Sequence, residues 1–491
     1  SMFFLLEKQY FSKFDEKLNN FKEKLQNNPD VVARDISVCE KKVGVIYLQS
    51  MTDKKLISES IIAPILEVEK KEDLSIQNIK GSVLQNLACK DIENFSDALR
   101  AVVEDNVVIF VEGEEKYLKI DAEDFTTRQP SEPPTSSVLR GPREGFTENI
   151  KTNISMIRRR IKSDKLVLKN LFVGKYSNTQ VSLIYLKGVA DKKILKQIES
   201  QIKKIDIDGI VSSYYVECFL EQRPYSLFKQ VGSSEKPDII SAKILEGRVA
   251  ILVDNSPIVL TLPFIYAEEV QDVNDYYGRF YYATYMRWVR ILGLFMAVIV
   301  PGAYLAMRLY HYKIIPLKFL ITISNSNQGL PFTPFIELLF ILILFEILYE
   351  VSLRLPKFLG LATSIVGALI LGDTGVKAGL ISPPGVMIIA MSIIAVYTIP
   401  DQNMQLSLIR FVFLLLGGTL GFLGMVAGII YFCNYMNELN EYSAPYLAPI
   451  SPHIKNDRKD AMMKAPLREM TTRPKAFKNS NSVRLKDDDK E

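Results

Sequence analysis

The chain has few of the residues on which metal and histidine chemistry depend. Its 491 residues include 2 histidines, 4 cysteines and 1 tryptophan. His311 and His453 lie far apart in the sequence, and the cysteines are widely scattered, at Cys39, Cys89, Cys218 and Cys433. Such spacing indicates neither a disulfide framework nor a zinc site. We therefore predict no metal site and no cofactor.

Two other classes of protein are excluded by what is missing. No P-loop, dinucleotide-binding motif or nucleophile elbow occurs in the sequence, so we expect no enzyme. The formal net charge of +4 is too small to argue for a nucleic-acid partner. The apolar stretch Phe3–Leu6 is too short for the core of a signal peptide, and we expect the N-terminal region to stay in the cytoplasm.

What the chain does have is a block of long apolar runs between residues 289 and 431. A helix needs roughly 20 apolar residues to cross a bilayer core about 30 Å thick. Four runs reach or approach that length and another is shorter; in order they are Ile291–Met307, Phe335–Leu355, Phe358–Gly372, Ala378–Pro400 and Phe411–Cys433. No water-soluble protein carries such a block, so the sequence predicts an integral membrane protein.

The third run, Phe358–Gly372, is short and interrupted by glycine. Such segments are tolerated at membrane depth only where protein or a water-filled path satisfies the backbone. Basic residues lie before the first span, after the second and in the C-terminal tail, and the positive-inside tendency places all three groups in the cytoplasm. We therefore expect four spans, with Phe358–Gly372 re-entrant or half-spanning and both termini cytoplasmic. The basic loop after the first span argues against this topology.

The soluble part of the chain repeats itself. The segment from Val43 to Lys55 matches that from Val181 to Lys193 in order and spacing. This agreement argues for an internal duplication, with chance similarity as the alternative. We predict the fold class α/β plus a helical membrane domain. The parts are an α/β subdomain at 1–125, a linker at 126–138, a related α/β subdomain at 139–267, an aromatic interfacial segment at 268–290, a polytopic transmembrane domain at 291–437 and a basic cytoplasmic tail at 438–491.

The interfacial segment is rich in aromatic rings and in arginine, namely Arg279, Arg287 and Arg290. Both kinds of side chain favour the headgroup zone of a membrane, so we predict that this segment forms a collar there. A buried aromatic helix is the alternative, and the arginines make it the weaker interpretation.

Three stretches resemble a known family of proteins. They are residues 140–160, residues 245–254 and residues 354–372, and Pro445–Pro449 closes the set. Together they resemble the GerA family of spore germination proteins, the A subunits of nutrient germinant receptors, from about residue 30 to residue 474. The opening of the first stretch, Gly-Pro-Arg-Glu-Gly at 141–145, is highly specific. A paralogous A-type protein of the SpoVAF kind shares the same motifs.

The resemblance implies a multi-pass protein of the spore inner membrane that releases ions in response to nutrients. It further implies a transporter-like B subunit that binds the germinant, a lipoprotein C subunit, and A subunits that assemble around an ion pore in contact with membrane lipids. Five copies are expected from the family. A SpoVAF-type amplifier, a non-conducting scaffold or signalling subunit, and a secondary transporter remain alternatives. The visible repeat lies in the soluble half, which counts against transport.

The first candidate site is the turn and amphipathic helix at 140–160. The resemblance favours a subunit-interface or coupling segment, whereas composition alone favours a solvated basic face. The helix should project its three consecutive arginines outward. The residues concerned are Arg140, Gly141, Pro142, Arg143, Glu144, Gly145, Arg158, Arg159 and Arg160.

Charged residues inside the second apolar run form the next candidate. Glu346 lies near the middle of that run, where a lipid-facing charge costs at least about 2.5 kcal/mol, so it should face protein or water. A pore carboxylate, a structural hydrogen bond and a proton-carrying site all remain open. Glu350 and Arg354 are spaced i, i+4, and we predict a structural ion pair between them.

The sharpest prediction concerns a gate in the short run Phe358–Gly372. No charged side chain lies between Lys357 and Asp373, so a gate there would close by dewetting. A packing helix is the alternative. We predict Val366 as the narrowest ring of a pore-lining face formed by Thr363, Val366 and Ile370.

Overall fold

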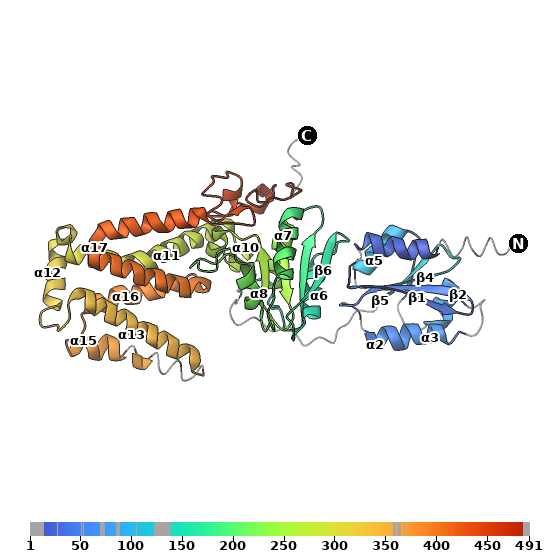
Figure 1. The fold of residues 1–491 in the computed structure, drawn as a ribbon, viewed down its shortest axis with the longest axis horizontal. Coiled ribbons are helices and arrows are strands. Elements are labelled where there is room, and N and C mark those ends of the chain that lie inside the picture. Colours follow the sequence, from blue (N-terminus) through green and yellow to red (C-terminus); the bar gives the residue numbers. More distant parts are fainter. Residues whose placement is uncertain are drawn as a thin grey trace. The chain divides into compact units, whose positions relative to one another are not determined.

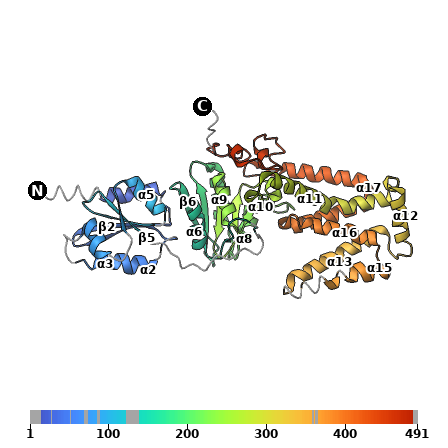
Figure 2. The same ribbon diagram turned by 180° about the vertical axis from the view of Figure 1, so that it is seen from behind.

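The computed structural model of the chain describes residues 14–26, 28–50, 52, 54–68, 74–84, 89–104, 106–121, 138, 140–356, 360, 365–367 and 369–484. The chain divides into two compact units (Figures 1 and 2). Unit 1 is Ser1–Phe264 with Glu441–Ala444 and Arg468–Glu491, and unit 2 is Ile265–Asn440 with Pro445–Leu467.

Unit 1 contains two five-stranded sheets of identical topology. The first has the order β1 (Val31–Val38), β2 (Lys41–Leu48), β4 (Asn106–Val111), β5 (Tyr117–Asp121) and β3 (Cys89–Ile92). The second has the order β6 (Leu166–Val173), β7 (Thr179–Leu186), β9 (Val249–Val253), β10 (Val259–Leu262) and β8 (Gly232–Ser234). The shared order confirms two related subdomains. Each pairing of these strands is antiparallel, so α+β describes the soluble class better than the predicted α/β.

Helices cover both faces of each sheet because successive strand side chains point to opposite sides. In β2, Val43 and Val45 enter the core on one face, whereas Ile46 and Leu48 enter the core on the other. The helical elements around the first sheet are α2 (Lys54–Leu56), η1 (Ile57–Ile62), α3 (Ala63–Leu66), α4 (Ile76–Asn78), η3 (Ile79–Val83) and α5 (Phe95–Val103).

The second sheet separates two pairs of helices. α7 (Lys192–Lys203) and α8 (Ser213–Leu220) share one core with this sheet. On the other face, α6 (Ile150–Arg160) and α9 (Pro237–Leu245) share another core with it. α6 and α9 thus lie on the face of the sheet opposite to α7 and α8.

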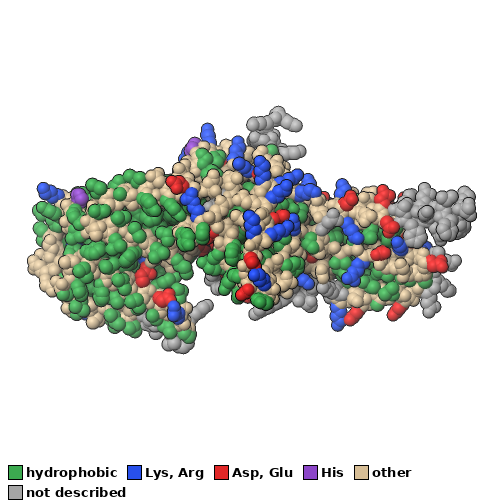
Figure 3. Space-filling view, in the orientation of Figure 1, with side chains coloured by type: hydrophobic (Ala, Val, Ile, Leu, Met, Phe, Trp, Pro, Cys, Tyr) green, Lys and Arg blue, Asp and Glu red, His purple; other side chains and the backbone are tan. Residues whose placement is uncertain are grey.

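Unit 2 is helical and its surface is rich in hydrophobic side chains (Figure 3). Two helical segments of the described chain are long and apolar enough to cross a membrane, Phe280–Leu309 and Pro400–Glu438. The elements are η4 (Tyr266–Val270), α10 (Val273–Tyr277), α11 (Phe280–Leu309), η5 (Tyr312–Ile314), α12 (Leu317–Ser326), α13 (Pro334–Arg354), η6 (Leu369–Thr374), α15 (Gly375–Lys377), α16 (Pro383–Val396), η7 (Pro400–Gln402) and α17 (Asn403–Glu438).

α17 is a helical hairpin rather than one straight helix. Gly421 has φ 63° and ψ −148°, which no α-helical residue adopts. Phe413 and Phe432 would lie about 28 Å apart along a straight helix, yet their ring centroids are 5.7 Å apart. Figure 1 shows the two arms converging. The single straight span predicted at Phe411–Cys433 is therefore wrong, because the glycine permits a left-handed backbone and a reversal.

Close backbone contact holds this hairpin against α11. A Cβ atom on Gly417 would lie 2.2 Å from the carbonyl oxygen of Gly302, and one on Gly302 would lie 2.4 Å from the carbonyl oxygen of Phe413. Tyr310, at the end of α11, donates a hydrogen bond to the carbonyl of Thr419 over 2.7 Å. The glycine-rich stripe therefore lets two helices approach closely.

The C-terminal segment, predicted as a basic cytoplasmic tail, is folded where it is described. β11 (Asn440–Glu441) and β12 (Ala444–Pro445) form a hairpin, followed by η8 (Asp457–Lys459) and η9 (Leu467–Glu469). Within unit 1, the buried Tyr442 belongs to the α7/α8 core, and the Phe477 ring lies 4.2 Å from the guanidinium carbon of Arg248. Apolar side chains spaced along a basic segment explain this packing.

Candidate functional site

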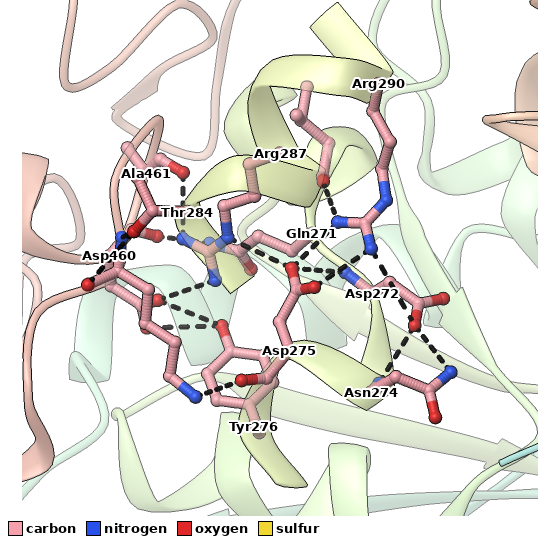
Figure 4. Close-up of polar contacts among 12 residues, drawn as sticks. Gln271, Asp272, Asn274, Asp275, Tyr276, Thr284, Arg287, Arg290, Asp460 and Ala461 are labelled. Carbon is pink, nitrogen blue, oxygen red and sulfur yellow. Dashed lines mark hydrogen bonds and ion pairs between the residues drawn. The ribbon is translucent and has the colours of Figure 1, made fainter. Parts of the chain in front are cut away.

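A buried charge network lies at the start of α11 (Figure 4). Arg287 is fully buried. Its Nε donates to a carboxylate oxygen of Asp275 over 3.0 Å, its Nη2 to Asp460 over 3.0 Å, and its Nη1 to the carbonyl of Ala461 over 2.8 Å. Arginine suits such a place because its planar group donates in several fixed directions. The network therefore joins the helix to the segment after α17.

Asp275 is shared between two arginines. It lies in α10, whose first turn is capped by the carboxylate of Asp272. Arg290 donates to both oxygens of Asp275, over 2.8 Å and 2.9 Å, and also to the carbonyl of Val270 over 2.9 Å. With Arg287 included, one carboxylate receives three charge-assisted hydrogen bonds, which are roughly twice as strong as neutral ones.

The two carboxylates of the network respond to their surroundings in opposite ways. Burial is the largest influence on Asp275 and by itself raises the pKa, but the hydrogen bonds and charges of Arg290 and Arg287 outweigh it and hold that pKa below the usual value. Burial also raises the pKa of Asp460, and there Arg287 and Tyr276 only reduce the effect. The surroundings thus favour the charged form of Asp275 and disfavour the charged form of Asp460.

Four more contacts tie the same two segments together. The Lys464 backbone N–H donates to the Thr284 hydroxyl over 3.0 Å, and the Lys464 ammonium donates to the carbonyl of Asp275. That ammonium also lies 4.7 Å from the centroid of the Tyr276 ring, and burial lowers its pKa. The side-chain amide of Gln271 donates to the carbonyl of Asp460 over 2.5 Å. The segment after α17 is therefore clamped to α10 and α11.

This network changes the role of one residue, Arg287, in the predicted interfacial collar. Arg287 is buried and forms ion pairs with Asp275 and Asp460, so its side chain is not exposed to lipid headgroups. The aromatic side chains of the same segment are exposed, as a collar requires. They are Tyr276, Phe280, Tyr281, Tyr282, Tyr285 and Trp288.

The carboxylate Glu346 of α13 has a partner that the sequence prediction missed. Arg410, in the first arm of α17, donates from Nη2 to Glu346 over 2.5 Å, and the Ser407 hydroxyl donates to the same oxygen. The Arg410 side chain is 3% exposed and that of Glu346 is 40% exposed. Arg410 also donates to the Ser392 hydroxyl over 3.4 Å. Glu346 thus faces protein on one side and is open on the other.

A second carboxylate, Glu337, is completely buried at the beginning of α13. It accepts a hydrogen bond from the backbone N–H of Ser382 over 2.7 Å and another from the Ser382 hydroxyl, at the start of α16. Arg308, in the last turn of α11, lies 3.4 Å away. A Cβ atom on Gly385 would lie 2.7 Å from Glu337. One carboxylate of α13 therefore joins α13 to α11 and α16.

The predicted ion pair forms in the structure, whereas the predicted gate is not tested by it. Glu350 and Arg354 pair at 2.5 Å with both side chains mostly exposed, so the pair forms but contributes little to stability. Val366 is 52% exposed and Ile370 is 54% exposed. Thr363 lies outside the described residues. The pore-lining face and its gate at Val366 stay a prediction.

The turn before α6 is held by specific contacts. The buried Lys236 ammonium donates to the carbonyl of Pro142 over 3.0 Å, and Arg160 pairs with Glu144 at 2.7 Å. Arg158 does not project outward as predicted, because it is 4% exposed and pairs with Asp30 at 3.1 Å within unit 1. Of the arginines in the segment, Arg140, Arg143 and Arg159 are exposed.

Several residues of these clusters were missed by sequence reasoning. Arg410 stands directly before the last apolar run, and Asp275 and Asp460 lie outside the runs altogether. One signal could have found Arg410: a buried intramembrane carboxylate needs a partner, and few basic residues lie near apolar segments. Nothing in the sequence pairs Asp460 with Arg287, because 173 residues separate them.

Comparison with known proteins identifies the family. The family profile described as "Bacillus/Clostridium GerA spore germination protein" matches residues 19–476. The chain is 35% identical to "Spore germination protein KA" of Bacillus subtilis (strain 168), over 94% of this chain and 86% of that protein. It is 33% identical to "Uncharacterized membrane protein YfkQ" of the same organism, over 94% of this chain and 92% of that protein.

A solved structure is also similar. It is the crystal structure of the N-terminal domain of the A subunit of the Bacillus megaterium spore germinant receptor GerK3. The sequence identity is 28%, the match covers 50% of this chain and 92% of that one, and the TM-score is 0.40. From the extent of the profile match and the identity to its relatives, this chain belongs to the GerA family of spore germination proteins.

Proposed function

We propose that this chain is the membrane subunit of a germinant receptor and that several copies form an ion channel, which releases ions from the spore in response to nutrients. Family membership supports the role in germination. The resemblance adds a transporter-like germinant-binding subunit, a lipoprotein subunit, a pentameric ring and the spore inner membrane. The chain then acts as the conducting part of a larger complex.

The observation that carries the proposal of a channel is the half-exposed Glu346 in a helical unit whose surface is largely apolar. An isolated carboxylate in hydrocarbon is expensive, so its open side should meet water or protein in the assembled complex. Arg410 pairs with the Glu346 carboxylate from inside the protein, and the Glu346 side chain stays 40% exposed. A water-filled path between copies accounts for a carboxylate that is paired with Arg410 and is still partly exposed.

The hairpin of α17 supports a multi-pass topology with both ends on one side. At 1.5 Å per residue, each arm of about 18 residues is about 27 Å long, close to the thickness of a bilayer core. The end of α11 meets the turn of the hairpin through Tyr310, while Arg287, near the start of α11, holds Asp460 beyond the second arm. We propose that the segments before α11 and after α17 both face the cytoplasm.

The test is potassium efflux from proteoliposomes that contain the purified full-length protein. In the background of Val366→Ala, which should open the gate, Glu346→Gln should change efflux several-fold while the complex stays assembled. Glu350→Gln removes an exposed carboxylate one turn away and is the matched control. Equal efflux with and without Glu346→Gln would remove this residue from the ion path.

A further inference from the structure

Unit 1 exposes a largely aromatic surface at α8 and in the loops on either side of it. We call it the α8 surface. In the described chain its apolar members are each more than a third exposed, and Tyr225 is 99% exposed. Large apolar side chains gathered on a soluble surface mark an interaction site rather than chance exposure. The members of the α8 surface are Val211, Tyr214, Tyr215, Phe219, Tyr225 and Leu227.

Tyr442 connects the core beneath α8 to the segment that follows α17 along the chain. Tyr442 follows the last residue of α17, Glu438, by four residues, which span at most about 14 Å. The Tyr442 hydroxyl donates to the carbonyl of Leu220, the last residue of α8, over 2.8 Å. The side chain is 1% exposed and forms part of the core beneath α8. The chain thus passes from the last residue of α17 into the core beneath α8 within four residues.

The chemistry of the surface suits a lipid headgroup region. Tyrosine combines an apolar ring with a polar tip, and this is why it collects where hydrocarbon meets water. Glu217, on the same helix, loses its charge more readily than an ordinary carboxylate. Burial is the main cause and raises the pKa of Glu217 to about 7, although Lys229 opposes the shift.

We infer that the α8 surface docks on the headgroup layer of the membrane that holds unit 2. The inference rests on the proposed membrane location of unit 2, but not on ion conduction. Docking would fix the second subdomain to the bilayer at the point where the chain leaves α17. A movement of α17 would then be transmitted to a subdomain that already has a fixed orientation.

Two native cysteines make the inference testable in the intact protein. Cys218 is exposed on α8, and Cys433 is exposed on the second arm of α17. The full-length protein would be placed in phosphatidylcholine nanodiscs with a nitroxide on a fraction of the headgroups. A bimane dye would be attached to Cys218 or to Cys433 in variants whose other cysteines are serine. Lys151→Cys, on α6 at the opposite face of the sheet, is the matched control.

The inference predicts that dye on Cys218 and dye on Cys433 each lose about half or more of their fluorescence, whereas dye at Lys151→Cys loses little. Replacing Tyr215 and Phe219 by serine should release the Cys218 dye from quenching, and Tyr176→Ser, which removes an even more exposed ring elsewhere in unit 1, should not. Quenching at Cys433 without quenching at Cys218 would overturn the docking and leave the membrane location standing. No quenching at Cys433 would overturn both.

A second copy of the chain is the competing occupant. If the Cys218 dye is shielded from solvent yet unquenched, and Cys218 can be cross-linked to Cys218 of a neighbouring copy, then a copy covers the α8 surface. That result would also overturn the inference.

Discussion

At the scale of single residues, several charged side chains of unit 2 are paired with a charge of opposite sign. Glu346 meets Arg410, Glu337 meets Arg308, and Asp275 meets Arg287 and Arg290. Removing one partner of a buried pair leaves the other uncompensated, and this penalty exceeds the net stability that the pair itself contributes. Each pair is therefore a place where one substitution tests the arrangement.

The first prediction concerns Arg410. Arg410→Met should lower the free energy of unfolding by about 1–3 kcal/mol, less than for a fully buried pair because Glu346 keeps one open side. Adding Glu346→Gln should restore part of the loss, and thermal unfolding of the detergent-purified protein measures both. Arg354→Met, at the exposed pair with Glu350, should change little. Strictly additive effects of the two substitutions would show that the pair is not coupled.

The second prediction concerns pH and Asp275. Its pKa is lowered in the folded protein, so its contribution to stability is present above the unfolded pKa of about 3.9 and is lost as the pH falls through the folded value. The melting temperature should therefore fall steeply in acid. Asp275→Asn should lower stability at pH 7 by about 3 kcal/mol and flatten the acid dependence.

The control for this prediction is Asp460. Its pKa is raised, so its contribution is present below the unfolded value and is lost as the pH rises through the folded one. Asp460→Asn should thus be milder at pH 7 than Asp275→Asn. If Asp460→Asn lowers the melting temperature at pH 7 more than Asp275→Asn does, then Asp275 is not the carboxylate that contributes most to the network.

At this scale the sequence indicated single residues but not their partners. Glu346 was found because a charge in the middle of an apolar run is rare. Arg410, its partner, was missed because it stands just outside a run. Arg158 was placed on an outer face by helical spacing, but its burial depends on Asp30, which spacing within one helix cannot show.

At the scale of elements, close approach of α11 and α17 depends on glycine. The third prediction is that Gly417→Ala forces these helices apart, because its Cβ would lie 2.2 Å from the carbonyl oxygen of Gly302, and backbone cannot yield as a side chain tip can. Loss of about 2 kcal/mol or more is expected, measured by thermal unfolding. Gly372→Ala, where no atom lies within 4 Å, is the control. Equal stability of the two variants would contradict the tight packing.

The elements also show where pattern reasoning succeeds and where it stops. The repeat at Val43 and Val181 predicted two related sheets because equal alternation and spacing place equal residues at equal strand positions. Strand direction was not predicted, since alternation is the same in either direction. The reversal at Gly421 was missed because a glycine in an apolar run indicates close packing as readily as a turn.

At the scale of the whole molecule, the proposed channel needs several copies of the chain. The described helices of unit 2 expose apolar side chains such as Val366 and Ile370, which lipid or another copy must cover. The fourth prediction is that native mass spectrometry of the detergent-purified protein finds a closed oligomer, with five copies expected from the family. A strictly monomeric mass at micromolar concentration would contradict the ring.

The central claim is that several copies conduct ions through a gate at Val366, and potassium efflux from proteoliposomes tests it most directly. Wild-type protein should leak little without stimulus, because an apolar constriction excludes water. Val366→Ala should widen the constriction and increase efflux at least about tenfold, whereas Val366→Trp should leave efflux low and the oligomer intact. Unchanged efflux in both variants, with assembly preserved, would contradict the gate and favour a non-conducting scaffold.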